Sequence, residues 1–206
     1  MSSEFALFDG LNVSRETFAR FETYVDLVNR WNPKINLVSK NSLSEIWTRH
    51  ILDSVQVFRC AQSFGHWVDL GSGGGFPGMV CALMAIDEAP DTRFTFLESD
   101  QRKSAFLRNV ARECGANCTV VSKRIELAEP AGADVLSARA LADLSKLLSF
   151  CDRHLADSGV ALFPKGANWK KELEEAREEW NFDVEPIRSL TEPQAVILKV
   201  KGVSRG

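Results

Sequence analysis

The sequence predicts an α/β fold built on a mostly parallel sheet of seven strands, with an antiparallel edge and a helical cap at the N-terminus. Three observations support this prediction. From residue 66 onward, short apolar runs alternate with longer stretches of helical periodicity. Two helical stretches precede that alternation, and two strand-like runs joined at Thr191-Glu192-Pro193 follow it. Alternating strands and helices form βαβ units with parallel strands, whereas a closing strand pair is most easily antiparallel.

The first helix is predicted to begin after Ser14, whose side chain suits the N-cap position. We expect it to end near Trp31-Asn32-Pro33, because the residue before a proline is disfavoured in helical geometry. Apolar residues at helical spacing predict one buried face of this helix, formed by Phe18, Phe21, Val25 and Val28.

A second helix is predicted to open with the capping box Ser42-Leu43-Ser44-Glu45, in which serine and glutamate side chains satisfy free backbone amides. His50 lies on the apolar face of this helix, so we expect a core histidine. Asp53, three residues later, is a candidate partner for its ring. The predicted apolar face comprises Ile46, Trp47, His50, Ile51, Val55 and Phe58.

The rest of the chain alternates between strands and helices. The predicted strands span residues 66–70, 93–97, 118–122, 134–137, 159–163, 183–189 and 195–201. The predicted helices span residues 77–86, 101–114, 141–155 and 168–180, and Asp100 is the expected N-cap of the second. Open α/β sheets bind ligands at the carboxyl ends of their strands, so the loops that follow the strands are the candidate functional segments.

Length and composition indicate one domain with its own core, because the 206 residues are 45% hydrophobic. We expect residues 1–206 to form a single domain, with a helical cap at 1–63 and a ligand-binding α/β core at 64–206. No apolar run approaches the length of a membrane span, and Met1 to Gly10 lacks the basic and apolar stretches of a leader. We therefore expect a cytoplasmic monomer with no membrane partner.

Charge and cysteine content narrow the function classes. The net charge of −3 argues against a protein that coats nucleic acid non-specifically, although a local basic face remains compatible with it. The cysteines show no C-x-x-C spacing, so neither a disulfide framework nor a metal site is indicated. They are Cys60, Cys81, Cys114, Cys118 and Cys151.

Residues 68–78 read VDLGSGGGFPG and form the most informative stretch of the chain. Leu70 ends a predicted strand, and Pro77 suits the first turn of the helix that follows. Glycine lets a loop turn sharply and lets a ligand reach the backbone. The stretch therefore predicts a ligand-binding loop at the carboxyl end of the first strand.

Two classes of cofactor fit this loop. The spacing G-x-G-x-x-G from Gly73 to Gly78, with Glu98 falling 20 residues later, matches a dinucleotide fingerprint. However, Asp69 before the loop would repel a pyrophosphate, and Phe76-Pro77 crowds the helix N-terminus that would receive it. S-adenosylmethionine (SAM) carries an ammonium group and meets no such conflict. The residues thus favour SAM, with Asp69 and Gly73 as candidate cofactor-binding residues.

Two further strand ends supply groups suited to an adenosine. Glu98 ends the second strand, where its carboxylate can accept hydrogen bonds from both ribose hydroxyls. Ile125 and Glu126 follow the third strand, where an adenine would lie. Ile125 can pack on the ring and donate its backbone N–H, and Glu126 can accept from the exocyclic amine. Together the three loops describe one adenosine site.

These stretches belong to a wider set of motifs that covers nearly the whole chain. The set comprises WNPKINL at 31–37, RHILDS at 49–54, DLGSGGGFPG at 69–78, LES at 97–99, RK at 102–103, FL at 106–107, RIE at 124–126, SARA at 137–140 and PKG at 164–166. In these motifs the chain resembles the RsmG family, also called glucose-inhibited division protein B. The family commonly has aspartate where this chain has Glu98, a conservative departure compatible with a ribose role.

The resemblance implies a Rossmann-like SAM-dependent methyltransferase fold and methylation of N7 of a guanine in 16S ribosomal RNA of the small subunit. Carried over position by position, it implies that SAM is contacted by Gly71, Phe76, Ile125, Glu126 and Arg139.

The chemistry of that reaction agrees with what the sequence lacks. Guanine N7 is a neutral acceptor with a free lone pair, so its methylation removes no proton and requires no general base. The fourth strand ends in Leu136-Ser137-Ala138-Arg139, without the Asn/Asp-Pro-Pro-Tyr signature of amine methylation or the Pro-Cys nucleophile of pyrimidine methylation. No catalytic acid or base is therefore assigned, and alignment of the reactants is expected to carry the rate.

Four basic residues are candidates for substrate binding. Arg139 is expected to bind an RNA phosphate, the guanine O6 or the SAM carboxylate, because donation to N7 would block the reacting lone pair. Lys165, after the fifth strand, is the second positioning candidate. Arg102 and Lys103 load the helix after the second strand with positive charge and are candidates to flank the RNA.

Two other functions remain open on the residues alone. A nicotinamide-dependent oxidoreductase is disfavoured by Asp69 and by the lack of an evident proton relay. A non-catalytic ribosome-assembly factor could retain the same fold. Measuring whether the protein binds SAM or NAD distinguishes a methyltransferase from the oxidoreductase. Measuring methyl transfer to small ribosomal subunits distinguishes a methyltransferase from the assembly factor.

Overall fold

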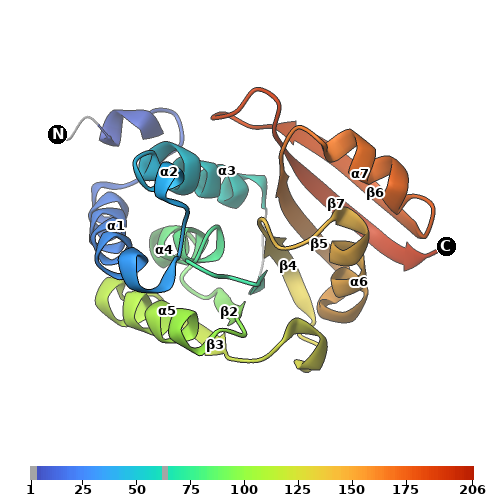
Figure 1. Cartoon of the computed structure of the whole chain (residues 1–206), viewed down its shortest axis with the longest axis horizontal. Coiled ribbons are helices and arrows are strands. Elements are labelled where there is room, and N and C mark those ends of the chain that lie inside the picture. Colours follow the sequence, from blue (N-terminus) through green and yellow to red (C-terminus); the bar gives the residue numbers. More distant parts are fainter. Residues whose placement is uncertain (1–3, 62–64) are drawn as a thin grey trace.

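The computed structural model describes residues 4–61 and 65–206. Within them, seven strands form one sheet in the order β3-β2-β1-β4-β5-β7-β6 (Figure 1). The strands are β1 (His66–Leu70), β2 (Arg93–Leu97), β3 (Cys118–Val121), β4 (Ala133–Ala138), β5 (Leu155–Lys165), β6 (Trp180–Arg188) and β7 (Val196–Arg205).

The sheet is parallel from β3 to β5 and antiparallel at its β7 and β6 edge. The order reverses at β1, which pairs with β2 on one side and with β4 on the other. This arrangement confirms the predicted mostly parallel sheet with an antiparallel edge. Ligands of such sheets bind outside the carboxyl ends of the strands near the reversal, which here means the loops after β1 and β4.

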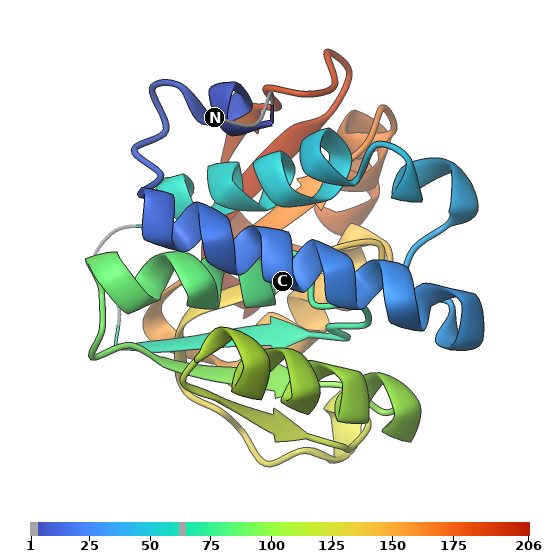
Figure 2. The same cartoon turned by 90° about the vertical axis from the view of Figure 1, so that its left-hand side faces the viewer.

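Helices cover both faces of the sheet. Figure 2 shows α1 (Arg15–Ile35), α3 (Asp53–Cys60), α4 (Gly78–Glu88) and α5 (Gln101–Cys114) in front of one face. The other face is covered by α6 (Leu144–His154) and α7 (Trp169–Ala176). Short helical segments complete the chain: η1 (Phe5–Phe8), α2 (Lys40–Leu43), the π-helical η2 (Trp47–Leu52) and η3 (Ile125–Leu127).

Two apolar clusters, one on each side of the sheet, form the core. Trp67 of β1 belongs to the cluster under α1, α3, α4 and α5, whereas Val68 and Leu70 belong to the cluster under α6 and α7. Successive strand residues point to opposite faces, so a strand buried on both sides is apolar at nearly every position. Asp69 is the exception in β1: it is 1% exposed and shares the face of Trp67.

The first helix extends beyond the predicted end at Pro33. It continues to Ile35 and ends at Asn36, which adopts the left-handed conformation at φ 50°. The backbone N–H of Asn36 donates to the carbonyl of Asn32, and the Asn32 side chain accepts from the Val38 amide at 2.9 Å. These bonds and the burial of Ile35 outweigh the preference of the residue before a proline for extended geometry.

The predicted capping box at Ser42 was wrong. The residue that caps is Ser39, whose side chain accepts from the Ser42 amide at 3.2 Å and begins the short helix α2. The chain then passes through η2, a wide helical turn, before α3 begins at Asp53. The path of the chain is decided by the packing of Ile46, Ile51 and Leu52 in the core. This packing outweighs the local spacing of serine and glutamate that predicted the capping box.

Other predicted boundaries differ by a few residues. The helix expected from Pro77 begins at Gly78 with Pro77 as its cap, and the Phe76–Pro77 peptide bond is cis. The helix expected at 168–180 ends at Ala176, because Trp180 already belongs to β6 and is buried. The proposed boundary between residues 63 and 64 lies outside the described residues. Within the described parts of the chain, no helix is long and apolar enough to cross a membrane.

Candidate active site

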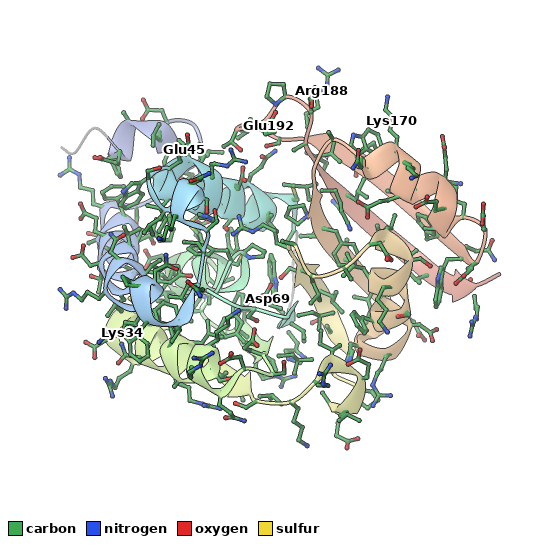
Figure 3. The ribbon with its side chains drawn as sticks, in the orientation of Figure 1. Lys34, Glu45, Asp69, Lys170, Arg188 and Glu192 are labelled. Carbon is green, nitrogen blue, oxygen red and sulfur yellow. The ribbon has the colours of Figure 1, made fainter. Side chains whose placement is uncertain are left out.

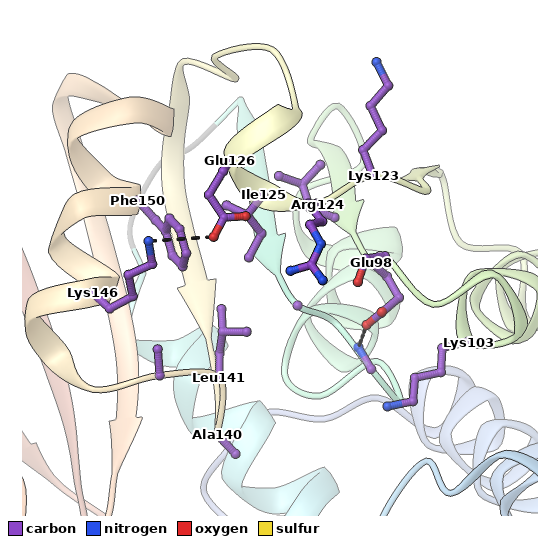
Figure 4. Close-up of a pocket in the computed structure, with 15 residues that line it drawn as sticks. Glu98, Lys103, Lys123, Arg124, Ile125, Glu126, Ala140, Leu141, Lys146 and Phe150 are labelled. Atoms are coloured by element: carbon purple, nitrogen blue, oxygen red, sulfur yellow. Dashed lines mark hydrogen bonds and ion pairs between the residues drawn. The ribbon is translucent and has the colours of Figure 1, made fainter.

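A cavity of about 420 Å³ opens at the carboxyl ends of β1, β2, β3 and β4 (Figure 4). The loops after these strands supply Gly71 and Gly73, residues 97–99, residues 123–126 and residues 140–142. Side chains of α5 and α6 complete the wall: Lys103, Lys146 and Phe150. The volume lies within the usual range for small-molecule sites. The three predicted adenosine loops therefore meet around one cavity.

The glycine loop has a backbone that side chains would not allow. Gly71, Gly73 and Gly75 have φ values of +59°, +53° and +95°, a region that favours glycine. A Cβ atom on Gly75 would also lie 2.5 Å from the hydroxyl of Tyr24. That hydroxyl donates to the carbonyl of Gly74, so α1 holds the loop from behind.

Gly78 has a different role, which is to let α4 approach the sheet. A Cβ atom at Gly78 would lie 2.6 Å from Cβ and Cγ of Asp69 and 2.7 Å from the ring of Phe96. The last glycine of the motif is therefore a packing glycine between the helix and the strands.

Glu98 lines the cavity and also holds the glycine loop. Its Oε2 accepts from the Gly73 amide at 2.8 Å, and its Oε1 accepts from the Asp100 amide at 2.7 Å. The side chain is 7% exposed. Because each carboxylate oxygen can accept a second hydrogen bond, Glu98 is both oriented by the protein and able to receive a ligand hydroxyl.

The loop after β3 forms the opposite wall. Ile125 is buried, and its carbonyl accepts from Nε2 of the buried His154 at 3.0 Å. Glu126 is half exposed and pairs with Lys146 at 3.7 Å. The guanidinium of Arg124 points into the cavity between Ile125 and Glu98 (Figure 4). The cavity thus offers an apolar wall at Ile125 and both signs of charge around it.

Asp69 lies beneath the loop and does not line this cavity. Its Oδ1 accepts from the Ser137 hydroxyl at 2.5 Å. Its Oδ2 is buried without a hydrogen bond of ordinary geometry, although the Gly78 amide favours the charged form. Burial raises the pKa of Asp69 to about 6, against the opposing effects of Ser137, Ser72, Arg139 and Gly78. A buried carboxylate with an unsatisfied oxygen is costly to the fold, which is typical of a functional position.

Phe76 also lies outside the cavity, in a stack of rings between the loop and the helical cap. Its ring centroid is 5.2 Å from that of Tyr24 and 4.7 Å from that of His50. The guanidinium carbon of Arg139 lies 5.3 Å from the same centroid, within the range of a cation–π contact. The Phe-Pro end of the glycine loop therefore supports Arg139.

Arg139 follows β4 and is clamped by residues of η2. Its Nη1 donates to the carbonyl of Arg49 at 2.9 Å, and its Nη2 donates to Nδ1 of His50. Burial lowers the pKa of Arg139, while Asp53, Tyr24 and Asp69 oppose that change. A guanidinium stays protonated in proteins, so the site holds a positive charge in one orientation.

The π-helical turn makes this clamp possible. The backbone N–H of Asp53 donates to the carbonyls of Thr48 and His50 and not to that of Arg49. The carbonyl of Arg49 accepts from Arg139 instead. Burial, Arg139 and Arg49 lower the pKa of His50 to about 3, so its ring is neutral at physiological pH. With Nδ1 as the acceptor, the proton is on Nε2, which is buried and has no partner among the described residues.

Asp53 is not the partner of His50, contrary to expectation. It accepts a hydrogen bond from the hydroxyl of Thr191 in the loop between β6 and β7. Burial raises the pKa of Asp53, and the bond from Thr191 opposes that effect. The aspartate therefore joins the helical cap to the C-terminal strand pair.

The remaining predicted substrate residues differ in their surroundings. The Lys165 ammonium donates to the carbonyl of Ala142 at 2.8 Å and to Glu172 at 2.6 Å, and its side chain is 8% exposed. Lys165 therefore ties the loop after β4 to α7 and offers no free charge. Lys103 lines the cofactor-sized cavity. Arg102 is exposed and lies 3.4 Å from Asp100.

Three residues that position the site were not found from the sequence. Leu141 packs against Gly71, where a Cβ atom would lie 2.6 Å from it. His154 holds Ile125, and Tyr24 holds Gly74. Tyr24, the single tyrosine of the chain, lies on an otherwise apolar helix face, and that contrast was an available signal.

Known proteins resemble this chain over nearly its whole length. A model of the family described as rRNA small subunit methyltransferase G matches residues 17–197. The protein named ribosomal RNA small subunit methyltransferase G in Ruegeria pomeroyi is 63% identical over 195 residues, covering 95% of this chain and 96% of the relative. Its namesake in Cereibacter sphaeroides is 50% identical over 197 residues, covering 95% of each chain.

Solved structures share the fold at low identity. A TehB-like SAM-dependent methyltransferase from Corynebacterium glutamicum superposes with a TM-score of 0.59 at 13% identity, covering 88% of this chain and 98% of that one. A chain of a fibrillarin/Nop5p complex superposes with a TM-score of 0.56 at 11% identity, covering 75% of this chain and 81% of that one. These likenesses confirm the Rossmann-like methyltransferase fold. On the family match and the high identity to its members, the chain belongs to the rRNA small subunit methyltransferase G family.

Proposed function

We propose that this protein transfers a methyl group from SAM to N7 of a guanine in 16S ribosomal RNA of the small subunit. One observation carries the proposal: the loops after β1, β2 and β3 place glycine backbone, Glu98 and Ile125 around a single cavity beside the fixed guanidinium of Arg139. Family membership and the printed name of the relatives support an RNA substrate.

The residues around the cavity fit SAM as its cofactor. Glu98 would accept from the ribose hydroxyls with the lone pairs that the Gly73 and Asp100 amides leave free. Ile125 would pack on the adenine, and Glu126 would accept from its amine after release from the weak pair with Lys146. Gly71 and Gly73 would offer backbone to the methionine part. When bound, SAM supplies a methyl group on a sulfonium, whose carbon–sulfur bond breaks as N7 takes the methyl.

Asp69, Phe76 and Arg139 would act on the same reaction from outside the cavity. The charge of Asp69 below the loop favours a ligand with a positive end. Phe76 supports the guanidinium of Arg139, and Arg49 and His50 fix its direction. A cation held in this way would bind a phosphate or the guanine O6 and leave N7 free. No proton is removed from N7, so these residues supply alignment and charge and need no general base.

The substrate, location and assembly follow from this function as further proposals. We place the protein in the cytoplasm, where small subunits are made, and we take it to act as a monomer. Residues 1–63 would serve as a helical cap on the SAM-binding core at 64–206. With a net charge of −3, the chain is suited to a structured ribosomal particle more than to bare RNA.

Methyl transfer tests the proposal directly. Purified protein is incubated with radiolabelled SAM and small subunits from a strain that lacks this activity, and the modified nucleotide is mapped by mass spectrometry. The expected product is one 7-methylguanine in 16S RNA. Binding of SAM without any methyl transfer would favour the assembly-factor alternative, and calorimetric binding of NAD but not SAM would favour the oxidoreductase.

A further inference from the structure

A second hollow lies apart from the cofactor cavity, where β5 and β6 end and α7 begins. Its volume is about 630 Å³. We call it the α7 groove, and it is lined by Trp169 and Lys170 of α7, by Pro186 and Arg188 of β6 and by Pro193 of the loop before β7. Figure 3 shows the side chains of Lys170 and Arg188 pointing outward from neighbouring elements.

The groove lies at the same end of the strands as the cofactor cavity. Lys165, Val196 and Arg188 are opposite one another at the ends of three adjacent strands, β5, β7 and β6. Arg139 follows the last residue of β4, which neighbours β5. Three strand spacings from β4 to β6 amount to about 14 Å, since adjacent strands lie about 4.8 Å apart. A polymeric substrate whose reacting group lies beside Arg139 could therefore extend directly into the groove.

The charge of the groove is positive and unneutralised. Within the described residues, no carboxylate lines it, and neither Lys170 nor Arg188 forms an ion pair. Two other lysines nearby are paired: Lys165 with Glu172 at 2.6 Å, and Lys171 with Glu175 at 3.6 Å. The Lys170 ammonium lies 5.6 Å from the ring centroid of the half-buried Trp169. In a chain of net charge −3, two cations without a carboxylate partner beside an aromatic ring are suited to an anionic ligand with flat rings.

The wall of the groove is held from the helical cap. The Gln56 side chain of α3 donates to the carbonyl of Arg188 at 2.6 Å and accepts from the Leu190 amide at 3.0 Å. Asp53, one turn earlier, accepts from Thr191. The Glu192 carboxylate accepts from the Gln194 amide at 3.4 Å and is not part of the lining. The same helical segment thus orients both Arg139 and the groove, so the two are placed relative to each other.

We propose that the α7 groove binds the RNA strand that flanks the methylated guanine. A base stacks on Trp169, and backbone phosphates pair with Lys170 and Arg188. Stacking on an aromatic ring combined with cations along the backbone is the usual way to hold single-stranded nucleic acid. This inference rests on the proposed function, and it assigns to the groove substrate affinity with no part in cofactor binding.

Steady-state methyl transfer to small subunits tests the groove. The variant Lys170→Ala/Arg188→Ala removes both free cations, and Trp169→Ala removes the ring. The matched control is Lys171→Ala/Arg177→Ala, which removes two cations from the same helix and the turn after it. Calorimetric SAM binding and thermal melting are measured for every variant.

The expected result is a KM for small subunits raised by at least tenfold in each groove variant, with kcat and SAM affinity unchanged. For Lys170→Ala/Arg188→Ala, the slope of log KM against log salt falls by about 1.4, or about 0.7 for each lost single-strand phosphate contact. Trp169→Phe, which keeps a flat ring, restores most of the affinity. If Lys170→Ala/Arg188→Ala melts at a lower temperature than the parent protein, the single substitutions Lys170→Gln and Arg188→Gln are compared in its place.

Two outcomes would overturn the proposal. The first is a groove variant that keeps the KM and salt slope of the control while the parent protein methylates its RNA. The second comes from a crosslinking experiment with p-benzoylphenylalanine placed at position 169, which is expected to crosslink to 16S RNA. Crosslinking only to a ribosomal protein would instead assign the groove to a protein partner. Absence of methylation by the parent protein itself would count against the proposed function, so the two failures are distinguishable.

Discussion

The guanidinium of Arg139 donates a hydrogen bond to Nδ1 of His50 and so joins the loop after β4 to the π-helical turn of the cap. The two side chains come from segments 89 residues apart in sequence. His50 must be neutral to accept this bond, and its pKa of about 3 satisfies that requirement. We therefore infer that His50 is a positioning residue for the guanidinium of Arg139, the substrate-binding cation proposed above.

His50→Asn and His50→Phe test this role as a pair. The asparagine oxygen can replace Nδ1 as acceptor, whereas phenylalanine leaves the Arg139 donor without a partner. We expect kcat for methyl transfer to fall about 100-fold in His50→Phe, the order of loss for a misplaced reacting group, and far less in His50→Asn. SAM affinity should stay at the parent value in both variants. Equal kcat losses in the two would assign His50 to packing alone.

The neutral state of His50 predicts acid sensitivity. Its pKa is lowered from 6.5 to about 3 in the folded protein, so between these values the unfolded chain binds a proton that the native chain does not. The free energy of unfolding should therefore fall as pH drops below 6.5, by about 2 kcal/mol at pH 5 for this residue. Urea unfolding at pH 7 and pH 5 measures the effect.

His50→Asn is the control for that measurement, because it cannot bind the proton. Burial also lowers the pKa values of His66 and His154, so part of the acid sensitivity should persist in the variant. The contribution of Asp69 to the free energy of unfolding increases as pH falls over part of this range. It does not affect the comparison, because the parent protein and His50→Asn both contain Asp69. An identical pH dependence for parent and variant would contradict the assignment of a neutral His50.

Asp69→Asn should stabilise the protein above pH 6. The pKa of Asp69 is raised from 3.8 to about 6, so the stability it contributes is complete below pH 4 and is lost as pH rises through 6. At pH 7 the loss is on the order of 3 kcal/mol, and the amide of asparagine avoids it. The stability advantage of Asp69→Asn should therefore grow from pH 4 to pH 7 in denaturant unfolding.

The same variant should bind SAM several-fold more weakly, because it lacks the negative charge below the loop. Asp91→Asn, at an exposed position, provides a charge-matched control with little change in either property. Unchanged SAM affinity in Asp69→Asn would restrict Asp69 to a structural part in the loop.

Gly78→Ala should be strongly destabilising although the change is a single methyl group. Its Cβ would lie 2.6 Å from Asp69 and 2.7 Å from Phe96, so α4 must move away from the sheet. Overpacking of this kind costs about 1–3 kcal/mol or more. Gly166→Ala is the matched control, because a Cβ atom there has nothing within 4 Å. Thermal melting of both variants checks the difference, and similar melting temperatures would refute the packing role.

The sequence by itself determined the fold class and the loops that line the cavity. Two-sided burial requires apolar strands, and loops that bring backbone to a ligand require glycine, so both leave local patterns that can be read without a structure. Glu98 and Ile125 lie in the lining of one cavity as expected, because the carboxyl ends of parallel strands meet at the same end of a sheet; their contacts with a cofactor stay a prediction. The family motifs pointed to the same cavity.

Tertiary structure alone decided which charges are free. Lys165 and Arg139 read alike in the sequence, as basic residues after adjacent strands, yet Lys165 is neutralised by Glu172 and Arg139 is clamped by Arg49 and His50. These partners lie on other elements, and local spacing carries no information about contacts across the sheet. The wide turn that exposes the Arg49 carbonyl was likewise decided by core packing, which overrode the serine pattern that predicts a capping box.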